Sequence, residues 1–481
     1  MRILFLTSEL FHFVKTGGLA DVAKALPLEL SHRGHELRIM LPCYSKINNW
    51  SSLPIVAELS LDNAPNSDRI SFRVRESRLG NITVWLIEHE YYFNRNNLYA
   101  ENNVAYPDNG ERFAFFSAAC LQTVQHLDFR PDIVHCNDWH TALTPMLLKT
   151  KYRSSEYFSN TKSVLTVHNG AFQGIFDRSQ LWMLPDIAHS NNDNITHGYA
   201  NINYLKAGVF YADKINAVSP SYAEELTTFL GGHGMAQNYM ARINDLCGIV
   251  NGCDYSDWDP LVDKNIPFHF SIEHQGNKSL CKYLLQEITS LPICDVPVFG
   301  MVCRLTAQKG INLLIPILND FLQHRVQLIL IGTGEPELES TLTKISQEHP
   351  DKFVFKSLYD NDLAHLIEAG ADFFLMPSLF EPCGLNQMYS LAYGTLPIVR
   401  AVGGLKDTII HYDEDRENAT GFIFFEPEPN ALLTCLRRVL IFYLQEPEEL
   451  QRLRDNAMRI RYEWKNSAEE YEIMYYSALQ K

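Results

Sequence analysis

The chain has 481 residues, of which 46% are hydrophobic and 20% are charged, and its formal net charge is −16. This composition is typical of a folded globular protein and excludes wholesale disorder, and the length predicts about three domains or two large ones. The acidic balance argues against nucleic acid as the main partner, because most of the surface repels a phosphate backbone.

In the first half of the chain, short runs of aliphatic residues alternate with longer amphipathic stretches. This pattern predicts strands at Ile3–Leu6, Glu36–Leu41, Thr83–Ile87, Ile133–His135 and Ser163–His168, and helices at Leu19–Arg33 and Phe113–Leu127. Strand–helix–strand alternation indicates a parallel sheet with helices on both faces.

The same alternation restarts late in the chain. It predicts strands at Val298–Val302, Val326–Ile331, Phe353–Phe355 and Phe373–Met376, and helices at Ile311–Gln323, Glu337–Gln347, Asp362–Ala369 and Gln387–Ala392. The turn-rich segment Gly248–Pro267 lies between the two halves and is the expected interdomain connection. The fold class is therefore α/β, with two doubly wound domains whose ligands are expected outside the carboxyl ends of the strands.

Ten cysteines are scattered along the chain without a C-x-x-C pair, which favours reduced thiols in a cytosolic protein. No apolar run reaches the roughly 18 residues of a membrane-spanning helix, and the N-terminal segment becomes polar too early for a signal peptide. We expect a cytoplasmic protein, or a plastid protein if a transit peptide has been removed.

The first candidate anion site is the segment Lys15-Thr-Gly-Gly-Leu-Ala-Asp21, which precedes the first predicted helix. Paired glycines allow backbone N–H groups to turn toward an anion, and Lys15 adds a full positive charge beside a helix N-terminus. Neither the G-x-G-x-x-G turn nor the Walker pattern is present. A helix entry with a solvated lysine is the alternative interpretation.

A second candidate, Arg304-Leu-Thr-Ala-Gln-Lys-Gly310, follows the predicted strand Val298–Val302. Arginine offers a planar bidentate donor and lysine a compact charge, so Arg304 and Lys309 can bind one diphosphate. Fixed cations at that place lower the barrier for departure of a diphosphate leaving group. A pair of surface cations is the alternative.

Glu381-Pro-Cys-Gly-Leu-Asn-Gln387 follows the predicted strand Phe373–Met376. The amides of Gly384, Leu385 and Asn386 could hold a phosphate while Glu381 accepts hydrogen bonds from hydroxyl groups. The alternative is an ordinary acidic residue at a helix start. A fourth segment, Gly403-Gly-Leu-Lys-Asp407, is either phosphate-facing or purely structural.

Two histidine-bearing segments, His135-Cys-Asn-Asp-Trp-His140 and Thr166-Val-His-Asn169, also follow strands. Asp138, His168 and Asn169 suit sugar hydroxyls. The histidine and cysteine spacing fits no structural zinc pattern, so metal binding is the less favoured reading. We expect His135 to be a hydrogen-bonded core histidine.

Taken together, the five segments 15–21, 135–140, 166–169, 304–310 and 381–387 resemble the bacterial and plant glycogen and starch synthases, glycosyltransferase family 5, over essentially the whole chain. The resemblance implies a GT-B fold, in which two Rossmann-like domains face each other across a deep cleft. It also implies retaining transfer of glucose from ADP-glucose to the non-reducing 4-OH end of an α-1,4-glucan (EC 2.4.1.21), without a metal or other cofactor. The implied partners are the donor and the glucan, with no nucleic acid and no membrane; a homo-oligomer is possible.

The resemblance also implies roles for individual residues. Glu381, His168, Asp138 and Asp21 match catalytic positions, and His168 would stabilise the developing charge of the glucose ring through its backbone carbonyl. The matching substrate-binding positions are Lys15, Gly17, Gly18, Tyr99, Asn169, Arg304, Lys309, Tyr359, Gly384, Leu385 and Asn386. Tyr359 would pack against the nucleoside. Tyr389 stands where many retaining relatives of this fold carry a second glutamate, which fits the synthase branch.

The expected domains are residues 1–248, on the acceptor side, residues 249–455, which bind the nucleotide sugar, and a C-terminal helical segment, residues 456–481, that crosses back to the first domain. Three alternative functions remain open. They are a transferase that uses UDP-glucose or a small acceptor, a phosphorylase-like enzyme with pyridoxal phosphate, and a glycan-binding protein without activity.

Overall fold

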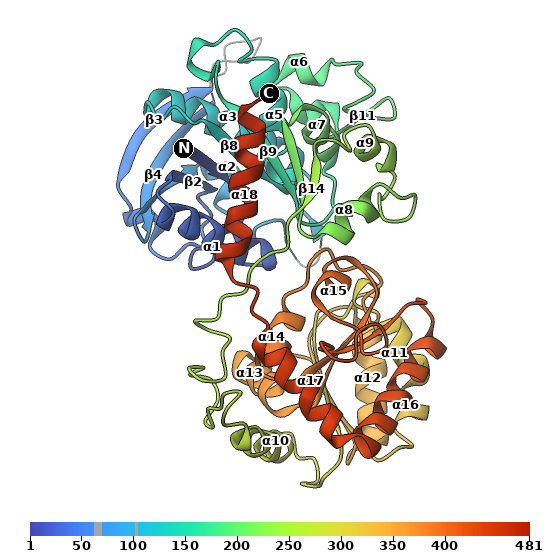
Figure 1. Cartoon of the computed structure of the whole chain (residues 1–481). Helices are drawn as coiled ribbons and strands as arrows, with labels where there is room; N and C mark the ends of the chain where they lie inside the picture. The colour runs from blue at the N-terminus through green and yellow to red at the C-terminus, as the bar shows by residue number, and fades with distance from the viewer. Residues whose placement is uncertain (62–69, 102–103) are drawn as a thin grey trace. The chain divides into compact units, whose positions relative to one another are not determined.

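The computed structural model describes residues 1–61, 70–101 and 104–481, which form two compact units (Figure 1). Unit 1 comprises residues 1–252 and 464–481, and unit 2 comprises residues 253–463. The chain therefore leaves unit 1 at Gly252 and returns to it at Trp464, at slightly later positions than residues 248 and 455. In the part of the chain that is described, no helix is long and apolar enough to span a membrane.

Unit 1 is built on one large, mostly parallel sheet. Its strands are β1 (Arg2–Leu6), β2 (Glu36–Pro42), β3 (Ile55–Leu61), β4 (Ile70–Leu79), β5 (Ile82–Glu88), β8 (Ile133–Asn137), β9 (Lys162–Val167), β13 (Lys214–Ala217) and β14 (Leu246–Gly248). The order across the sheet is β14-β13-β9-β8-β1-β2-β5-β4-β3, in which β4 pairs antiparallel with both β5 and β3 and the other neighbours are parallel. The predicted strands of this half are confirmed, whereas the β3–β4 hairpin was not predicted.

The helices of unit 1 are α1 (Gly18–His32), α2 (Glu90–Phe93), α3 (Asn109–His126), α4 (Asp138–Thr141), α5 (Leu143–Lys149), α6 (Pro185–Ala188), α7 (Tyr204–Tyr211), α8 (Pro220–Leu226), α9 (Ala236–Met240) and α18 (Trp464–Leu479). Short strands β10 (Ile175–Asp177), β11 (Thr196–His197) and β12 (Asn201–Asn203) form a small sheet, and β6 (Ala100–Glu101) pairs with β7 (Val104–Ala105). The apolar residues of α1 that recur at helical spacing are buried, as expected: Leu19, Val22, Ala23, Leu26 and Leu30.

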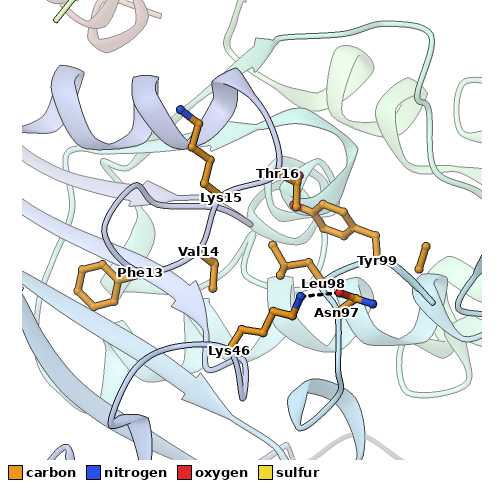
Figure 2. Close-up of a pocket in the computed structure, with 9 residues that line it drawn as sticks. Phe13, Val14, Lys15, Thr16, Lys46, Asn97, Leu98 and Tyr99 are labelled. Atoms are coloured by element: carbon orange, nitrogen blue, oxygen red, sulfur yellow. Dashed lines mark hydrogen bonds between the residues drawn. The ribbon is translucent and has the colours of Figure 1, made fainter. Parts of the chain in front are cut away.

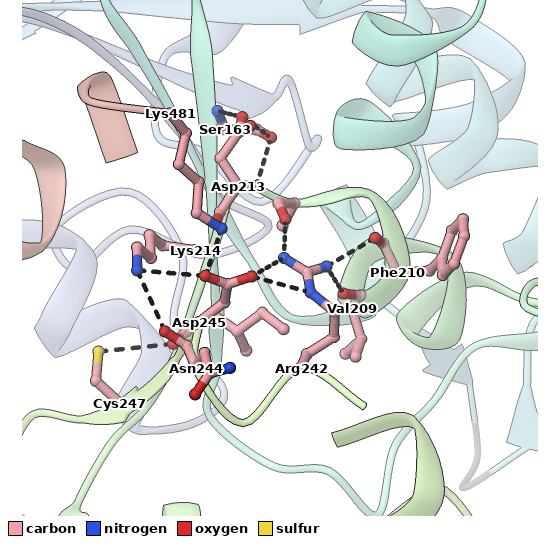
Figure 3. A network of polar contacts seen from close by, with 12 residues as sticks. Ser163, Val209, Phe210, Asp213, Lys214, Arg242, Asn244, Asp245, Cys247 and Lys481 are labelled. Atoms are coloured by element: carbon pink, nitrogen blue, oxygen red, sulfur yellow. Dashed lines mark hydrogen bonds and ion pairs between the residues drawn. The ribbon is translucent and has the colours of Figure 1, made fainter. Parts of the chain in front are cut away.

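Helix α18 belongs to unit 1 although it follows unit 2 in sequence. It packs against α1 and β9 (Figure 1). Beyond its end, Lys481 pairs with Asp245 and donates to the backbone oxygen of Asp213 at 2.9 Å (Figure 3). Arg242 and Lys214 bind the same Asp245 carboxylate, so the C-terminal segment is held by a network of charges at β13 and β14.

Unit 2 has a fully parallel sheet with the order β17-β16-β15-β18-β19-β20. Its strands are β15 (Val298–Val302), β16 (Gln327–Ile331), β17 (Phe353–Lys356), β18 (Phe373–Met376), β19 (Leu396–Arg400) and β20 (Phe422–Phe424). Its helices are α10 (Gly276–Ile288), α11 (Ile311–Phe321), α12 (Pro336–Glu348), α13 (Asn361–Gly370), α14 (Asn386–Ala392), α15 (Gly403–Thr408), α16 (Pro429–Gln445) and α17 (Pro447–Arg459). All strands and helices predicted for this half are present, shifted by at most a few residues.

Each sheet has a point where the strand order reverses. In unit 1 the reversal lies between β1 and β8, and in unit 2 it lies between β15 and β18. The loops that leave two such neighbouring strands diverge to opposite faces and leave a crevice at the carboxyl ends, where ligands of this fold bind. The candidate segments after β1, β8, β15 and β18 therefore occupy the positions that the topology favours.

Candidate active site

The loop between β1 and α1 carries Lys15. Its side chain is about half exposed, and Nζ forms an ion pair with Oδ1 of Asp21 at 2.8 Å. The same Nζ lies 5.0 Å from the centre of the Phe11 ring. The structure thus brings together two residues singled out in the sequence, at the first turn of α1.

Two backbone amides of this loop are bound by a side chain of the protein. The backbone N–H groups of Thr16 and Gly17 donate to Oε2 of Glu9, at 2.5 and 3.1 Å. Glu9 is buried, and its Oε1 also accepts from the hydroxyl groups of Thr16 and Tyr99, at 2.5 and 2.9 Å. A carboxylate of the protein therefore binds the amide of Gly17, one of the two glycines of the predicted anion site, and that of its neighbour Thr16.

A cavity of about 520 Å³ in unit 1 lies beside this loop (Figure 2). It is lined by Phe13, Val14, Lys15, Thr16, Lys46, Asn97, Leu98, Tyr99 and Ala100. Lys46 Nζ donates to Oδ1 of Asn97 at 2.5 Å across it. Thr16 and Tyr99 thus belong both to the wall of the cavity and to the hydrogen-bonding shell of Glu9.

Asp138 begins α4 directly after β8, with a φ of 54° that is uncommon for a residue with a side chain. Its Oδ1 accepts hydrogen bonds from the backbone N–H groups of His168 and Asn169, at 2.7 and 3.3 Å. Burial raises the pKa of Asp138 to about 7, against the lowering effect of these two amides. Backbone strain of this kind is concentrated at functional sites. The carboxylate fixes the backbone that carries the His168 carbonyl.

His168 itself is held by Asn137. Its Nε2 lies 2.8 Å from Oδ1 of Asn137, whose amide group donates to the Leu6 backbone oxygen at 2.9 Å. Because an amide oxygen can only accept, Nε2 of His168 carries the hydrogen. Burial lowers the pKa of His168 to about 3, so the ring is neutral. Asn137 connects β1, β8 and the segment after β9 where the strand order reverses.

The expectation for His135 is confirmed. The ring is fully buried, and its two nitrogens lie 2.7 Å from the Tyr475 hydroxyl and 2.8 Å from that of Thr166. His135 is a core residue that joins β8 to α18. Among the described residues there is no group of three or more histidine, cysteine or acidic side chains placed to hold a metal ion.

In unit 2, the loop 304–310 leaves β15 and packs against the chain after β18. The Leu379 amide donates to the Gln308 backbone oxygen at 2.8 Å. Gly310 has a φ of 72°, and a Cβ atom there would lie 1.9 Å from the Pro377 backbone oxygen. Only glycine satisfies both conditions. This close approach of two loops places Lys309 beside the segment that carries Glu381.

Lys309 and Glu381 form an ion pair, with Nζ 2.5 Å from Oε2. Glu381 is buried, and the Ser378 hydroxyl donates to the same oxygen at 3.0 Å. Arg304 is exposed at the start of the loop, and within the described residues its guanidinium makes no hydrogen bond or ion pair. The structure thus pairs two of the predicted residues, Lys309 and Glu381. The cationic side chain of Arg304 is exposed to solvent nearby in the chain.

The first turn of the segment Gly403–Asp407 packs against the backbone at Glu381. A Cβ atom on Gly403, whose φ is 42°, would lie 2.0 Å from the Glu381 backbone oxygen. The Gly404 amide donates to that same oxygen at 3.1 Å. The start of α15 therefore supports the loop that carries Glu381.

Most of the remaining predicted residues lie on or beside these loops. Asn386 uses its side-chain amide to donate to the Val302 backbone oxygen at 2.9 Å, which ties α14 to the end of β15. Gly384 and Leu385 precede α14 directly, and Gly18 is the first residue of α1. Tyr359, after β17, exposes 64% of its surface.

Sequence reasoning did not single out Glu9, Asn137 or Ser378 as functional. All three stand at the carboxyl end of a buried strand, which is the signal that could have revealed them. Their contacts could not be predicted from the sequence. Glu9 and Asn137 bind residues that are distant in sequence, and the contact of Ser378 with Glu381 depends on the conformation of their loop.

Comparison with known proteins agrees with this arrangement. Residues 2–240 match the family model described as starch synthase catalytic domain, and residues 290–459 match glycosyl transferases group 1. A glycogen synthase of Aeromonas hydrophila is 53% identical over 479 residues, covering 100% of this chain and 98% of that protein. One of Vibrio cholerae is 51% identical over 477 residues, with 98% of each chain covered.

Among solved structures, the catalytic domain of starch synthase IV from Arabidopsis thaliana, bound to ADP and acarbose, superposes with a TM-score of 0.88 at 28% identity. The match covers 100% of this chain and 99% of that one. A sucrose-phosphate synthase from Thermosynechococcus elongatus, at 18% identity and a TM-score of 0.59, shares the fold alone. Two parallel-sheet α/β units are thus those of the GT-B fold, and the chain belongs to the glycogen synthase family of glycosyltransferases.

Proposed function

We propose that the protein transfers glucose from ADP-glucose to the non-reducing 4-OH end of an α-1,4-glucan, with retention of configuration and release of ADP. Its place among full-length glycogen synthases supports this reaction. The solved starch synthase IV domain was bound to ADP and acarbose, and we extend to this chain the binding of a nucleotide and of an α-glucan.

The observation that carries the proposal is the Lys309–Glu381 ion pair at the strand-order reversal of unit 2. It places one cation and one carboxylate side by side where a nucleotide sugar binds in this fold. Lys309, with Arg304, would bind the diphosphate, and Glu381 would accept hydrogen bonds from the glucose hydroxyls and orient the ring. Tyr359 would stack on the nucleoside.

The proposed step breaks the bond from the glucose C1 to the phosphate oxygen and forms a bond from C1 to the acceptor O4 on the same face. The acceptor proton moves to the departing phosphate oxygen, so no protein nucleophile is needed. Negative charge grows on the diphosphate as the bond breaks, and the fixed cations stabilise it more in the transition state than in the bound donor.

Unit 1 would contribute three groups to this reaction. Lys15, paired with Asp21, would supply a further positive charge to the diphosphate. Asp138 would hold the backbone at His168 and Asn169, so that the His168 carbonyl faces the positive charge that develops on the glucose ring. A neutral His168 ring is compatible with this role, because the carbonyl and not the imidazole acts.

We also propose that the reaction takes place in the cytoplasm. All ten cysteines lie within the described residues and are free thiols, which supports a reducing compartment.

The deciding experiment incubates the protein with glycogen and with radiolabelled ADP-glucose or UDP-glucose in parallel, and measures label incorporated into polymer. We expect incorporation from ADP-glucose. Incorporation only from UDP-glucose, or only into a small sugar, would establish the other transferase, and binding of glycogen without turnover of either donor would establish an inactive glycan-binding protein. A visible absorbance of the pure protein would instead indicate pyridoxal phosphate.

A further inference from the structure

The further inference concerns Glu9, a buried carboxylate that the proposed reaction does not use. Glu9 is 4% exposed and accepts four hydrogen bonds from three residues. Two come from the backbone of Thr16 and Gly17, one from the Thr16 hydroxyl and one from the Tyr99 hydroxyl. A carboxylate can only accept hydrogen bonds, and all four of these groups donate to it, so each contact of Glu9 is a favourable hydrogen bond.

The contacts with Thr16 and Gly17 fix the two peptide units that follow Lys15. The orientation of the Thr16 N–H also sets the plane of the Lys15 carbonyl, because both belong to one planar peptide unit. The partners of the Lys15 side chain, Asp21 and the face of Phe11, are only partly buried. Without Glu9, these two amides would lose their acceptor within the protein, and the backbone at Lys15 would lose its main constraint.

Because Glu9 binds the amides of Thr16 and Gly17, those two groups are not available to an anion, and the Lys15 side chain supplies the positive charge of the loop. We propose that Glu9 is a positioning residue, which holds the 15–17 backbone so that the Lys15 ammonium is presented to the donor diphosphate. This inference rests on the proposed function for its kinetic readout. A displacement of about 1 Å at a charged group can cost on the order of a hundredfold in rate.

Glu9→Gln tests the inference with almost no change of volume. The amide oxygen of the new side chain can keep the two backbone N–H groups only if its NH₂ group faces the Thr16 and Tyr99 hydroxyls, which must then turn to accept, and every bond that remains loses the assistance of the charge. We expect the KM for ADP-glucose to rise at least about tenfold while the thermal midpoint stays within a few degrees. Glu36→Gln, an exposed glutamate on β2, makes the same charge change and should leave the KM unchanged.

A double-mutant cycle separates positioning from general damage. If Glu9 acts through Lys15, then Glu9→Gln combined with Lys15→Ala should have nearly the same KM as Lys15→Ala alone. Multiplicative effects of the two changes, or a KM for Glu9→Gln within twofold of the unchanged protein, would overturn the inference. Thr16→Val removes one of the four donors and should raise the KM in the same direction by about two- to fivefold, which provides a milder variant if Glu9→Gln does not fold.

Hydrogen exchange gives a readout that does not depend on the donor. Peptides covering residues 10–18 should exchange faster in Glu9→Gln, whereas peptides from α3 and from unit 2 should be unchanged. Unchanged exchange in this segment would refute the role of Glu9. If the unaltered protein does not turn over ADP-glucose, the proposed function fails, while the exchange result still decides whether Glu9 holds the loop.

Discussion

Lys15 and Lys24 offer an internal comparison, because both ammonium groups lie 5.0 Å from the centre of the same Phe11 ring. Only Lys15 lies on the loop after β1, whereas Lys24 lies within α1. We expect Lys15→Ala to raise the KM for ADP-glucose by about 10- to 100-fold, the loss typical of a charge-assisted contact. Steady-state kinetics of Lys15→Ala and Lys24→Ala measure this, and equal effects would remove Lys15 from the donor site.

Glu381 should affect turnover more than donor binding, because its contacts with the glucose ring would strengthen as the ring flattens. We expect Glu381→Gln to lower kcat by about 100- to 1000-fold and to change the KM for ADP-glucose less than tenfold. Ser378→Ala, which removes one donor from Glu381, should lower kcat more modestly. The exposed Glu426→Gln is the control, and a normal kcat for Glu381→Gln would contradict the assignment.

Of the elements, the loop 304–310 depends on a close approach that only Gly310 allows. Gly310→Ala introduces both an unfavourable φ and a collision with the Pro377 backbone oxygen, so we expect a loss of roughly 2 kcal/mol or more in unfolding free energy, with a fall in activity. Gly276→Ala, at the start of α10, meets no atom within 4 Å and should be neutral or slightly stabilising. Urea unfolding followed by circular dichroism measures both, and similar midpoints would disprove the constraint.

Three histidines at the carboxyl ends of β8 and β9 make unit 1 sensitive to acid. Burial lowers the pKa values of His135, His140 and His168 to about 3. An unfolded histidine titrates near 6.5, so between about pH 6.5 and 3 the unfolded state binds protons that the folded state does not. Stability is therefore complete above pH 6.5 and falls as the pH decreases through this window.

We expect His135→Gln to reduce this pH dependence, since it removes one of the three titrating groups. Hydrogen exchange of unit 1 peptides at pH 7.5 and pH 5.5 compares the variant with the unaltered protein. An equal decrease in protection for both would contradict the assignment of His135 as a buried neutral ring.

The elements that the sequence predicted well are those with clear periodicity. Buried strands such as β15 and β18 agree to the residue, and α1 differs by one residue at each end. The pair β3–β4 was missed, because both strands mix exposed and buried residues and lack a continuous apolar run. The candidate site residues were predicted from their position after strands and from the family resemblance, but the Glu9 contacts and the Lys309–Glu381 pair depend on tertiary packing and could not be read from the sequence.

At the scale of the whole molecule, α18 completes the core of unit 1, whose other elements lie far from it in sequence. The Tyr475 hydroxyl meets the buried His135 ring, and the Asn216 side chain donates to the Tyr471 hydroxyl at 2.9 Å. Tyr475→Phe leaves one buried nitrogen of His135 without a partner, so we expect unit 1 to lose about 1–3 kcal/mol. The half-exposed Tyr476→Phe is the matched control, and equal thermal midpoints for the two variants would contradict this dependence.

The return of the chain to unit 1 at Trp464 also bears on biosynthesis. Unit 2 is one continuous stretch and can fold as soon as it leaves the ribosome, whereas unit 1 must wait with an open groove until the last segment is translated. Throughout the synthesis of unit 2, the apolar surface that later receives α18 is available to chaperones. A chain released after residue 463 would therefore contain all of unit 2, whereas its unit 1 would lack α18.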